Sequence, residues 1–188
     1  MQKIVVFDIE TTGFSAQEDF ITQFAAQIHA ADGQLMEKVN FYLKHPTKKL
    51  TNPRVIATTG INQDLLDRQG LAYNQALKQI SEILLAADLL VGHNILKFDL
   101  PFIMKQIEIS HLPDWKTINT TLLAKGQNQA FDTMIEARKA DQVGPYARGY
   151  KLEDLVQKHN LQIEGATFHR ADADIAYTWK LYEKLTTK

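Results

Sequence analysis

The chain has 188 residues, of which 45% are hydrophobic and 23% are charged, a composition that suits one compact domain over residues 1–188. A formal net charge of −1 gives no sign of a generally basic surface, and the absence of cysteine excludes disulfides and thiolate metal sites. The first apolar run is interrupted by Asp8 and no segment has the apolar length of a membrane span, so we expect a cytoplasmic protein without a membrane partner.

The first third of the chain has the pattern of three antiparallel strands. Residues 3–9 are apolar on both faces, as in a central strand. Residues 20–31 and 34–44 flank Asp32-Gly33, a strong hairpin signal. We therefore expect these two segments to pair with each other.

Helices dominate the rest of the chain. Residues 74–87 carry apolar side chains at helical spacing, and residues 88–93 have the pattern of a buried strand. Further helices are predicted over residues 99–110, 151–159 and 171–186, and a helix is expected after Asp132-Thr133. Strands that alternate with helices indicate parallel crossovers, so the expected fold class is α/β, with a mixed sheet flanked by helices.

Two acidic residues stand at the end of the first predicted strand. Asp8 and Glu10 are two residues apart, so their side chains point to the same face. They would be ordinary surface residues if the strand were exposed, but the apolar run of residues 4–7 argues for burial. The end of such a strand lines a crevice, where open α/β sheets bind ligands.

The aspartates later in the chain have different expected roles, which depend on their positions in the predicted helices. Asp99 either caps the helix that follows it or binds a metal, and the two roles do not exclude each other. In the last helix, Asp174 falls on the apolar face beside Ile175, whereas Asp172 falls on the solvent side. An aspartate on an apolar face needs a partner, and a metal shared with other acids would serve. Asp172 is explained by its place in the first helical turn.

His169 precedes the last helix, so we expect it on a loop. An exposed histidine without a role is the alternative, but five residues before Asp174 it can fold over a bound metal and accept a proton near neutral pH. Carboxylates gathered in a crevice are costly unless divalent cations neutralise them. Asp8, Glu10, Asp99, Asp174 and His169 together predict metal-assisted attack of water on a phosphodiester.

Three motifs, in this order, resemble the DnaQ-like (DEDD-type) 3′–5′ exonucleases, a family with proofreading and RNA-trimming members. They are Asp8-Ile9-Glu10-Thr11-Thr12-Gly13, then Gly92-His93-Asn94 with Phe98-Asp99, and finally His169 with Asp174. The histidine marks the histidine branch, because the tyrosine branch would have Tyr where Arg170 and Ala171 stand. The resemblance covers residues 3–185.

The resemblance implies a ribonuclease-H-like fold with a five-stranded mixed sheet. It implies that Asp8, Glu10, Asp99 and Asp174 hold two Mg²⁺ or Mn²⁺ ions, while His169 takes the proton of the attacking water.

The candidates for contact with the terminal nucleotide are Glu10, Thr11, Thr12, Phe14 and Asn94. Core packing is the favoured role of Phe14. The segment 150–155 also matches the family, whereas residues 111–130 depart from it as a possible extra helix.

The expected function is metal-dependent hydrolysis at the 3′ end of single-stranded nucleic acid, DNA in the first place, with release of nucleoside 5′-monophosphates in DNA replication or repair. The alternatives are trimming of RNA or short oligonucleotides, and a catalytically silent nucleic-acid-binding scaffold. A polymerase or a second copy of the chain are further possible partners. The chain ends at Lys188, directly after the last helix, so we expect no tail that docks a polymerase.

Overall fold

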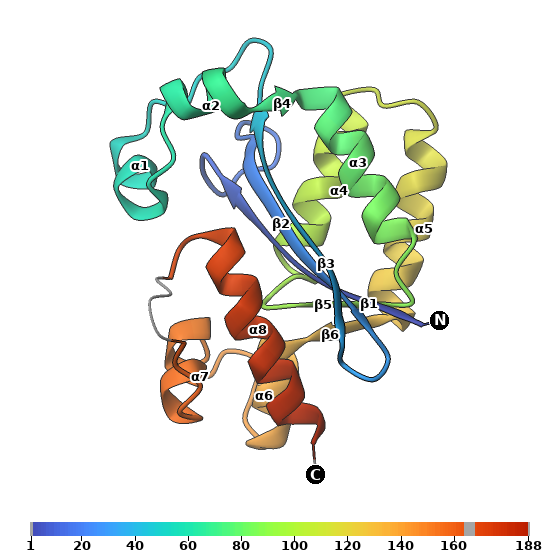
Figure 1. Ribbon diagram of the computed structural model, residues 1–188, viewed down its shortest axis with the longest axis vertical. Helices are drawn as coiled ribbons and strands as arrows, with labels where there is room; N and C mark the ends of the chain where they lie inside the picture. Colours follow the sequence, from blue (N-terminus) through green and yellow to red (C-terminus); the bar gives the residue numbers. More distant parts are fainter. Residues whose placement is uncertain (1, 164–167, 188) are drawn as a thin grey trace.

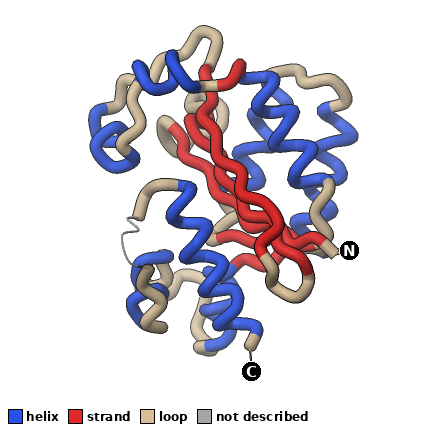
Figure 2. Tube along the Cα trace, viewed as in Figure 1, coloured by secondary structure: helices blue, strands red, loops and turns tan. Residues whose placement is uncertain are grey.

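The computed structural model describes residues 2–163 and 168–187. A six-stranded sheet with the order β4-β3-β2-β1-β5-β6 crosses the molecule, with helices on both sides (Figures 1 and 2). In chain order the elements are β1 (Lys3–Thr11), β2 (Ile21–Ala30), β3 (Leu35–Lys44), α1 (Pro53–Thr59), α2 (Gln63–Gln69), β4 (Leu71–Ala72), α3 (Tyr73–Leu85), β5 (Leu89–Gly92), α4 (Asp99–Ile109), α5 (Trp115–Asn128), β6 (Ala130–Asp132), α6 (Thr133–Ala140), α7 (Leu152–Lys158) and α8 (Ala171–Thr186). None of the helices in these described parts is long and apolar enough to cross a membrane.

The predicted α/β class and mixed sheet are confirmed, but the expected count of five strands is wrong. The additional strand is β4, which pairs in parallel with Leu43 and Lys44 of β3. Two residues are too few to show the alternation that identifies a strand in a sequence. Residues 111–130 do contain an extra helix, α5.

The predicted hairpin between β2 and β3 is confirmed, with a connection longer than two residues. The strands pair antiparallel, and residues 31–34 connect them. Gly33 has φ = +86°, in the left-handed region that glycine adopts without strain. A register shift between Ile28 and His29 accompanies the longer turn.

β1 is a central strand, antiparallel to β2 and parallel to β5. Its odd-numbered residues Val5, Phe7 and Ile9 pack into the core covered by α3, α4 and α5, whereas Ile4 and Val6 pack against α8 on the other face. Figure 1 shows these two helical layers on opposite sides of the sheet. Each fully buried side chain contributes about 1.5–3 kcal/mol. Asp8 and Glu10, the next even-numbered positions, therefore lie on the α8 face.

A ring stack fixes α8 against the sheet. The Trp179 ring of α8 lies parallel to the His29 ring of β2, with centroids 3.6 Å apart and an interplanar angle of 10°. The His29 Nδ1 atom lies 3.1 Å from the Gly33 carbonyl oxygen. Burial lowers the pKa of His29, so the ring stacks as neutral imidazole. The first turn of α8 is thereby placed at the end of β1.

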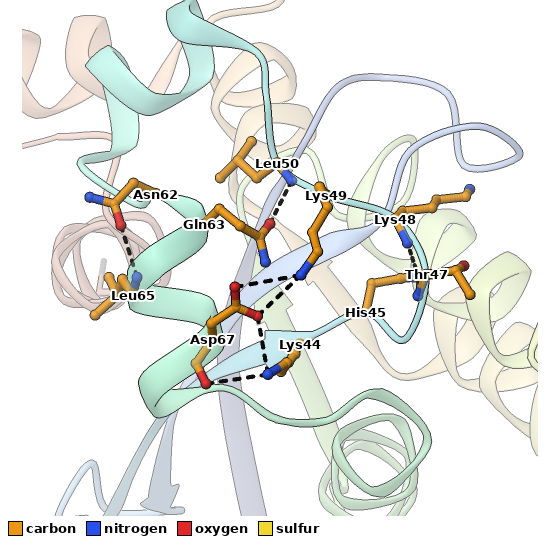
Figure 3. A network of polar contacts seen from close by, with 10 residues as sticks. All are labelled: Lys44, His45, Thr47, Lys48, Lys49, Leu50, Asn62, Gln63, Leu65 and Asp67. Atoms are coloured by element: carbon orange, nitrogen blue, oxygen red, sulfur yellow. Dashed lines mark hydrogen bonds and ion pairs between the residues drawn. The ribbon is translucent and has the colours of Figure 1, made fainter.

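A polar network joins the end of β3 to α2 and so fixes the chain on both sides of α1 (Figure 3). Asp67 of α2 forms ion pairs with Lys44 (3.1 Å) and Lys49 (3.3 Å). The backbone N–H of Leu50 donates to Gln63 Oε1 over 2.7 Å. This network matters for function because α1 borders the cavity described below.

Candidate active site

The site lies where the carboxyl ends of three parallel strands, β1, β5 and β6, meet at one edge of the sheet. Asp8 and Glu10 stand at the end of β1, Asp99 follows β5, and Asp132 ends β6. Crevices of this kind are the usual ligand sites of open α/β sheets.

Three carboxylates meet at this edge. Asp8, Glu10 and Asp174 each offer an oxygen atom, and these atoms lie within 4.8 Å of one another. Asp174 Oδ2 accepts a hydrogen bond from the backbone N–H of His169 (3.2 Å), whereas Oδ1 is buried and has no partner in the described part of the chain. A buried acceptor without a donor, beside two further carboxylates, fits a divalent cation.

Asp99 lies next to these three acids and is 2% exposed. Its Oδ1 atom accepts a hydrogen bond from the backbone N–H of Ile9 (3.1 Å), between Asp8 and Glu10 in the sequence. The capping role is wrong, because Asp99 is the first residue of α4 and the N-cap position belongs to Phe98. Asp99 therefore attaches α4 to β1 and brings a fourth carboxylate to the crevice.

Burial shifts the pKa values of all four acids upward. It raises the pKa of Asp8 well above its usual range, and the charges of Asp99, Glu10 and Asp174 add to the effect. Burial, with the charges of Asp174 and Asp99 next, raises the pKa of Glu10 to about 8. Burial also raises the pKa values of Asp99 and Asp174 to about 7. Four carboxylates so close together ionise fully only when positive charge is supplied.

The two aspartates of α8 have different partners, although both are half-buried. Asp174 faces the acids of β1, whereas Asp172 Oδ1 lies 3.2 Å from Arg170 Nε. Asp172 and Asp174 point in different directions because each residue of a helix is rotated by 100° from the one before it.

His169 lies on the loop before α8, as predicted, and has a left-handed φ of +65°. Its Nε2 atom is 2.8 Å from Oε1 of Glu153, in the first turn of α7. Sequence reasoning did not single out Glu153. The available signal was its place in the segment 150–155, which matches the family but does not reveal a contact with a residue of another loop.

A cavity of about 460 Å³ opens beside the acids, lined by Glu10 and Thr11 of β1, by α1 and by Phe98. Phe14 also lines it and is 93% exposed, so core packing is wrong for this residue. Its ring meets that of Phe98 edge to face, with centroids 6.1 Å apart. An exposed aromatic ring at the mouth of a cavity offers a surface on which a nucleobase can stack.

The two threonines after Glu10 have different surroundings. Thr11 lines the cavity, and its hydroxyl donates to Gly13 O (2.6 Å). Thr12 is buried and does not line this cavity. Its hydroxyl donates to Asp19 Oδ1 (2.9 Å) and accepts from Phe20 N–H (3.1 Å), so Thr12 shapes the turn.

A second hollow, of about 290 Å³, adjoins the first cavity at His169, which lines both. Asn94, Lys151 and Asp174 are among its lining residues. Asn94 is therefore placed away from the first cavity. It has φ = +63°, and its backbone N–H donates to Asp132 Oδ1 (3.0 Å).

His93 joins the end of β5 to the segment that carries Glu153. Its Nδ1 atom lies 2.9 Å from Thr133 Oγ1 and its Nε2 atom 3.0 Å from Tyr150 O. Burial lowers the pKa of His93 to about 4, so the ring is neutral and donates from Nε2 to the carbonyl oxygen. His93 therefore positions the start of α7.

Carboxylates on a strand end, an aspartate on a facing helix and a nearby histidine define the class of carboxylate-dependent phosphodiester hydrolases. A family model described as Exonuclease (RNase_T) matches residues 5–182, and the chain belongs to this family. The resemblance to DnaQ-like exonucleases is confirmed.

Similar proteins are much longer than this chain. The chain is 31% identical over 174 residues to a DNA polymerase III PolC-type of Ureaplasma parvum, a match that covers 90% of the chain and 10% of the relative. It is 29% identical over 191 residues to the 3′-5′ exonuclease DinG of Bacillus subtilis, covering 100% of the chain and 18% of the relative.

Solved structures of E. coli Exonuclease I have the same fold. The complex with a dT13 oligonucleotide superposes with a TM-score of 0.79 at 20% identity, covering 100% of this chain and 41% of that one. A structure described as Exonuclease I (apo) superposes with a TM-score of 0.79 at 19% identity, covering 98% of this chain and 41% of that one. The ribonuclease-H-like fold expected from the sequence is thereby confirmed.

Proposed function

We propose that this chain is a divalent-metal-dependent 3′–5′ exonuclease that releases nucleoside 5′-monophosphates from single-stranded DNA. The observation that carries the proposal is the meeting of Asp8, Glu10 and Asp174, with Oδ1 of Asp174 unpaired and buried. The names of the PolC-type and DinG relatives, and the dT13 oligonucleotide bound to Exonuclease I, support DNA as the substrate.

Asp8, Glu10, Asp99 and Asp174 are the residues that would hold two Mg²⁺ or Mn²⁺ ions. When bound, such ions supply an activated water and stabilise negative charge on the phosphate and the leaving oxygen. The four acids are otherwise too crowded to ionise together, so their raised pKa values support a site that binds positive charge.

His169 accepts the proton of the attacking water in this proposal. Its Nε2–H donates to Glu153, so the lone pair that takes the proton is on Nδ1. Glu153 stabilises the imidazolium that results and restricts rotation of an exposed ring. Such a carboxylate–histidine pair holds the ring in one orientation.

The 460 Å³ cavity accepts the terminal nucleotide. Phe14 stacks on its base, and Thr11 and Glu10 lie on the side of the sugar. The turn after β1 and α1 wall this cavity, so a chain terminus fits and a continuing strand is excluded. A paired end must first unstack and unpair, at a cost of a few kcal/mol by analogy with base extrusion, so single strands are preferred.

A single gel tests the proposal. Linear DNA and RNA, single-stranded and duplex, labelled at the 5′ end and ending in a 3′-hydroxyl or a 3′-phosphate, are incubated with Mg²⁺, Mn²⁺ or EDTA, alongside a circular single strand. We expect ladders that shorten from the 3′ end of single-stranded DNA, only with a cation, and no reaction at a 3′-phosphate. Cutting of a circular single strand, or activity in EDTA, would contradict the proposal, and faster shortening of RNA would assign the chain to RNA trimming.

We also propose that residues 1–188 form one exonuclease domain that acts in the cytoplasm during DNA replication or repair. The PolC-type relatives support a polymerase as a partner. Light scattering of the purified chain, alone and mixed with a replicative polymerase, tests both this partnership and a homodimer.

A further inference from the structure

A basic, aromatic surface adjoins the second hollow and has no role in the reaction described above. It consists of Lys97, Tyr146 and Lys151, and is called the Tyr146 surface. Tyr146 is 90% exposed, and Lys97 Nζ lies 5.9 Å from the centre of its ring. This contact brings the connection between β5 and α4 next to the connection between α6 and α7.

The Tyr146 surface is continuous with the candidate active site. Lys151 lines the second hollow together with Asn94 and Asp174. The backbone N–H of Lys97 donates to Asn94 O over 3.2 Å, so Lys97 lies one tight turn from the same hollow. The Tyr146 surface therefore borders the second hollow through Lys151 and through the turn from Asn94 to Lys97.

No ion pair between described residues neutralises the charge of this surface. Lys97 and Lys151 are exposed, and neither occurs in any ion pair between described residues. In contrast, Lys44, Lys49 and Lys105 each pair with a carboxylate. For a chain of net charge −1, positive charge left unpaired beside four acids complements a polyanion that must reach those acids.

The two hollows give a bound strand a direction. The cavity with Phe14 and the second hollow are distinct and share His169 in their linings. If the terminal nucleotide occupies the first cavity and the scissile phosphate lies at the acids, the preceding nucleotides occupy the second hollow and continue over Tyr146.

We propose that Lys97, Tyr146 and Lys151 bind the nucleotides 5′ to the scissile phosphate of a single strand. The Tyr146 ring stacks on a base, and the two ammonium groups contact phosphates. This arrangement tolerates any sequence, because every base has a face on which a ring can stack. The inference rests on the proposed function, from which the direction of the strand is taken.

The test compares substrate lengths. Steady-state kinetics are measured for a DNA dinucleotide and an octamer with a 3′-hydroxyl. Tyr146→Ala is expected to raise KM for the octamer by about 5- to 100-fold, the usual worth of one stacked base, and to leave the dinucleotide unchanged. Tyr146→Phe keeps the ring and is expected to restore the wild-type KM. An exposed side chain leaves the fold intact when truncated, which circular dichroism checks.

The lysines are tested by salt dependence. Lys97→Ala and Lys151→Ala are each expected to weaken octamer binding and to reduce the slope of log KM against log salt by about 0.7, the loss of one phosphate contact on a single strand. Lys184→Ala is the matched control, since Lys184 is exposed at the far end of α8 and occurs in none of the ion pairs found between described residues.

Two results would overturn the inference while the proposed function stands. One is a rise in KM of Tyr146→Ala that is equal for the dinucleotide and the octamer, which would show that Tyr146 supports the geometry of the acids. The other is an unchanged KM of Tyr146→Ala for both substrates, which would assign the surface to a different partner, such as a protein. If the wild-type chain degrades neither substrate, the proposed function and this inference both fail.

Discussion

Asp174 has a buried carboxylate oxygen, Oδ1, that accepts no hydrogen bond from the described residues. Asp174→Asn keeps the shape and removes the charge. We expect the rate to fall by about three orders of magnitude or more, and Mn²⁺ affinity measured by calorimetry to fall with it, since a metal-bound acid acts through the ion. Asp172→Asn is the matched control, because Asp172 pairs with Arg170 and should retain activity. Near-normal turnover by Asp174→Asn would remove this residue from the site.

The contact between Glu153 and His169 is testable by a double-mutant cycle. His169→Ala should lower kcat by about 10²–10⁴-fold, the usual worth of a general base. Glu153→Gln should lower kcat by about 10–100-fold with KM unchanged, as for other residues that orient a histidine. In the His169→Ala background the Glu153 substitution should cost nothing further.

Two other outcomes of this double-mutant cycle would contradict the proposed role of Glu153. An equal loss in both backgrounds would show that Glu153 only supports the fold. A faster rate for Glu153→Gln would show that the carboxylate keeps His169 away from the water. Glu136→Gln is the control, since Glu136 pairs with Lys139 on α6 and touches neither residue.

Single site residues were predictable where the residue type and its spacing along a strand or helix indicated the same role. Asp8, Glu10 and Asp174 followed from strand and helix periodicity, and the structure brings them together. The exposure of Phe14, a candidate for nucleotide contact, was not predicted, because an aromatic residue ordinarily packs in a core, whereas a turn leaves this one exposed. Glu153 was missed because its partner lies on another loop, a relation that no local period encodes.

At the scale of elements, the turn between β1 and β2 sets one wall of the cavity. A Cβ atom at Gly13 would overlap the Asp19 carboxylate. That carboxylate cannot easily move, because it accepts hydrogen bonds from Thr12 Oγ1 (2.9 Å) and Ser15 N–H (3.0 Å). Gly13→Ala should therefore destabilise the protein by about 1–3 kcal/mol, the usual cost of overpacking, and raise KM.

Chemical denaturation and steady-state kinetics measure both effects of Gly13→Ala. Gly144→Ala is the matched control, since nothing lies within 4 Å of a Cβ built there and its backbone is not left-handed. Equal stability of the two variants would show that the turn rearranges freely.

Long elements were predictable, and of the short ones β5 and α7 were predicted whereas α1, α2, β4 and β6 were not. α8 and the three strands of the first third have enough residues to show a period, and their boundaries match within a few residues. α1 and α2 have seven residues each, and β4 and β6 have two and three, too few for a period. Asn52 and Pro53 do mark the start of α1, as a capping side chain and an N-terminal proline.

At the scale of the whole molecule, the fold stabilises a site that is itself unfavourable without cations. The sheet order brings three parallel strand ends together, and α8 crosses them from the opposite face. The sequence does not show the strand order or the position of α8 directly. For example, β1 and β5 are neighbours in the sheet but are separated by most of the first half of the sequence. The family motifs conveyed that arrangement, which periodicity alone did not.

The raised pKa values predict how stability depends on pH. The folded-state pKa is about 8 for Glu10 and about 7 for Asp99 and Asp174, above the ordinary values of 4.5 and 3.8. The folded protein therefore binds more protons than the unfolded chain between about pH 4 and pH 8, and its stability falls as pH rises through this window. His93, with its pKa lowered to about 4, has the opposite effect, but that effect is complete by about pH 6.5.

The comparison is therefore made between pH 6.5 and pH 8.5, where the acids dominate. In EDTA we expect Tm to fall by about 5 °C or more across this interval, since about 2–4 °C corresponds to each kcal/mol in a protein of this size. Mg²⁺ or Mn²⁺ should raise Tm more at the higher pH, because the ion replaces protons on the acids. Glu10→Gln removes one charge from the crevice, so its Tm in EDTA should depend less on pH. A wild-type Tm in EDTA that stays constant or rises would show that these carboxylates ionise without a counter-charge, and would contradict the electrostatic basis of the metal site.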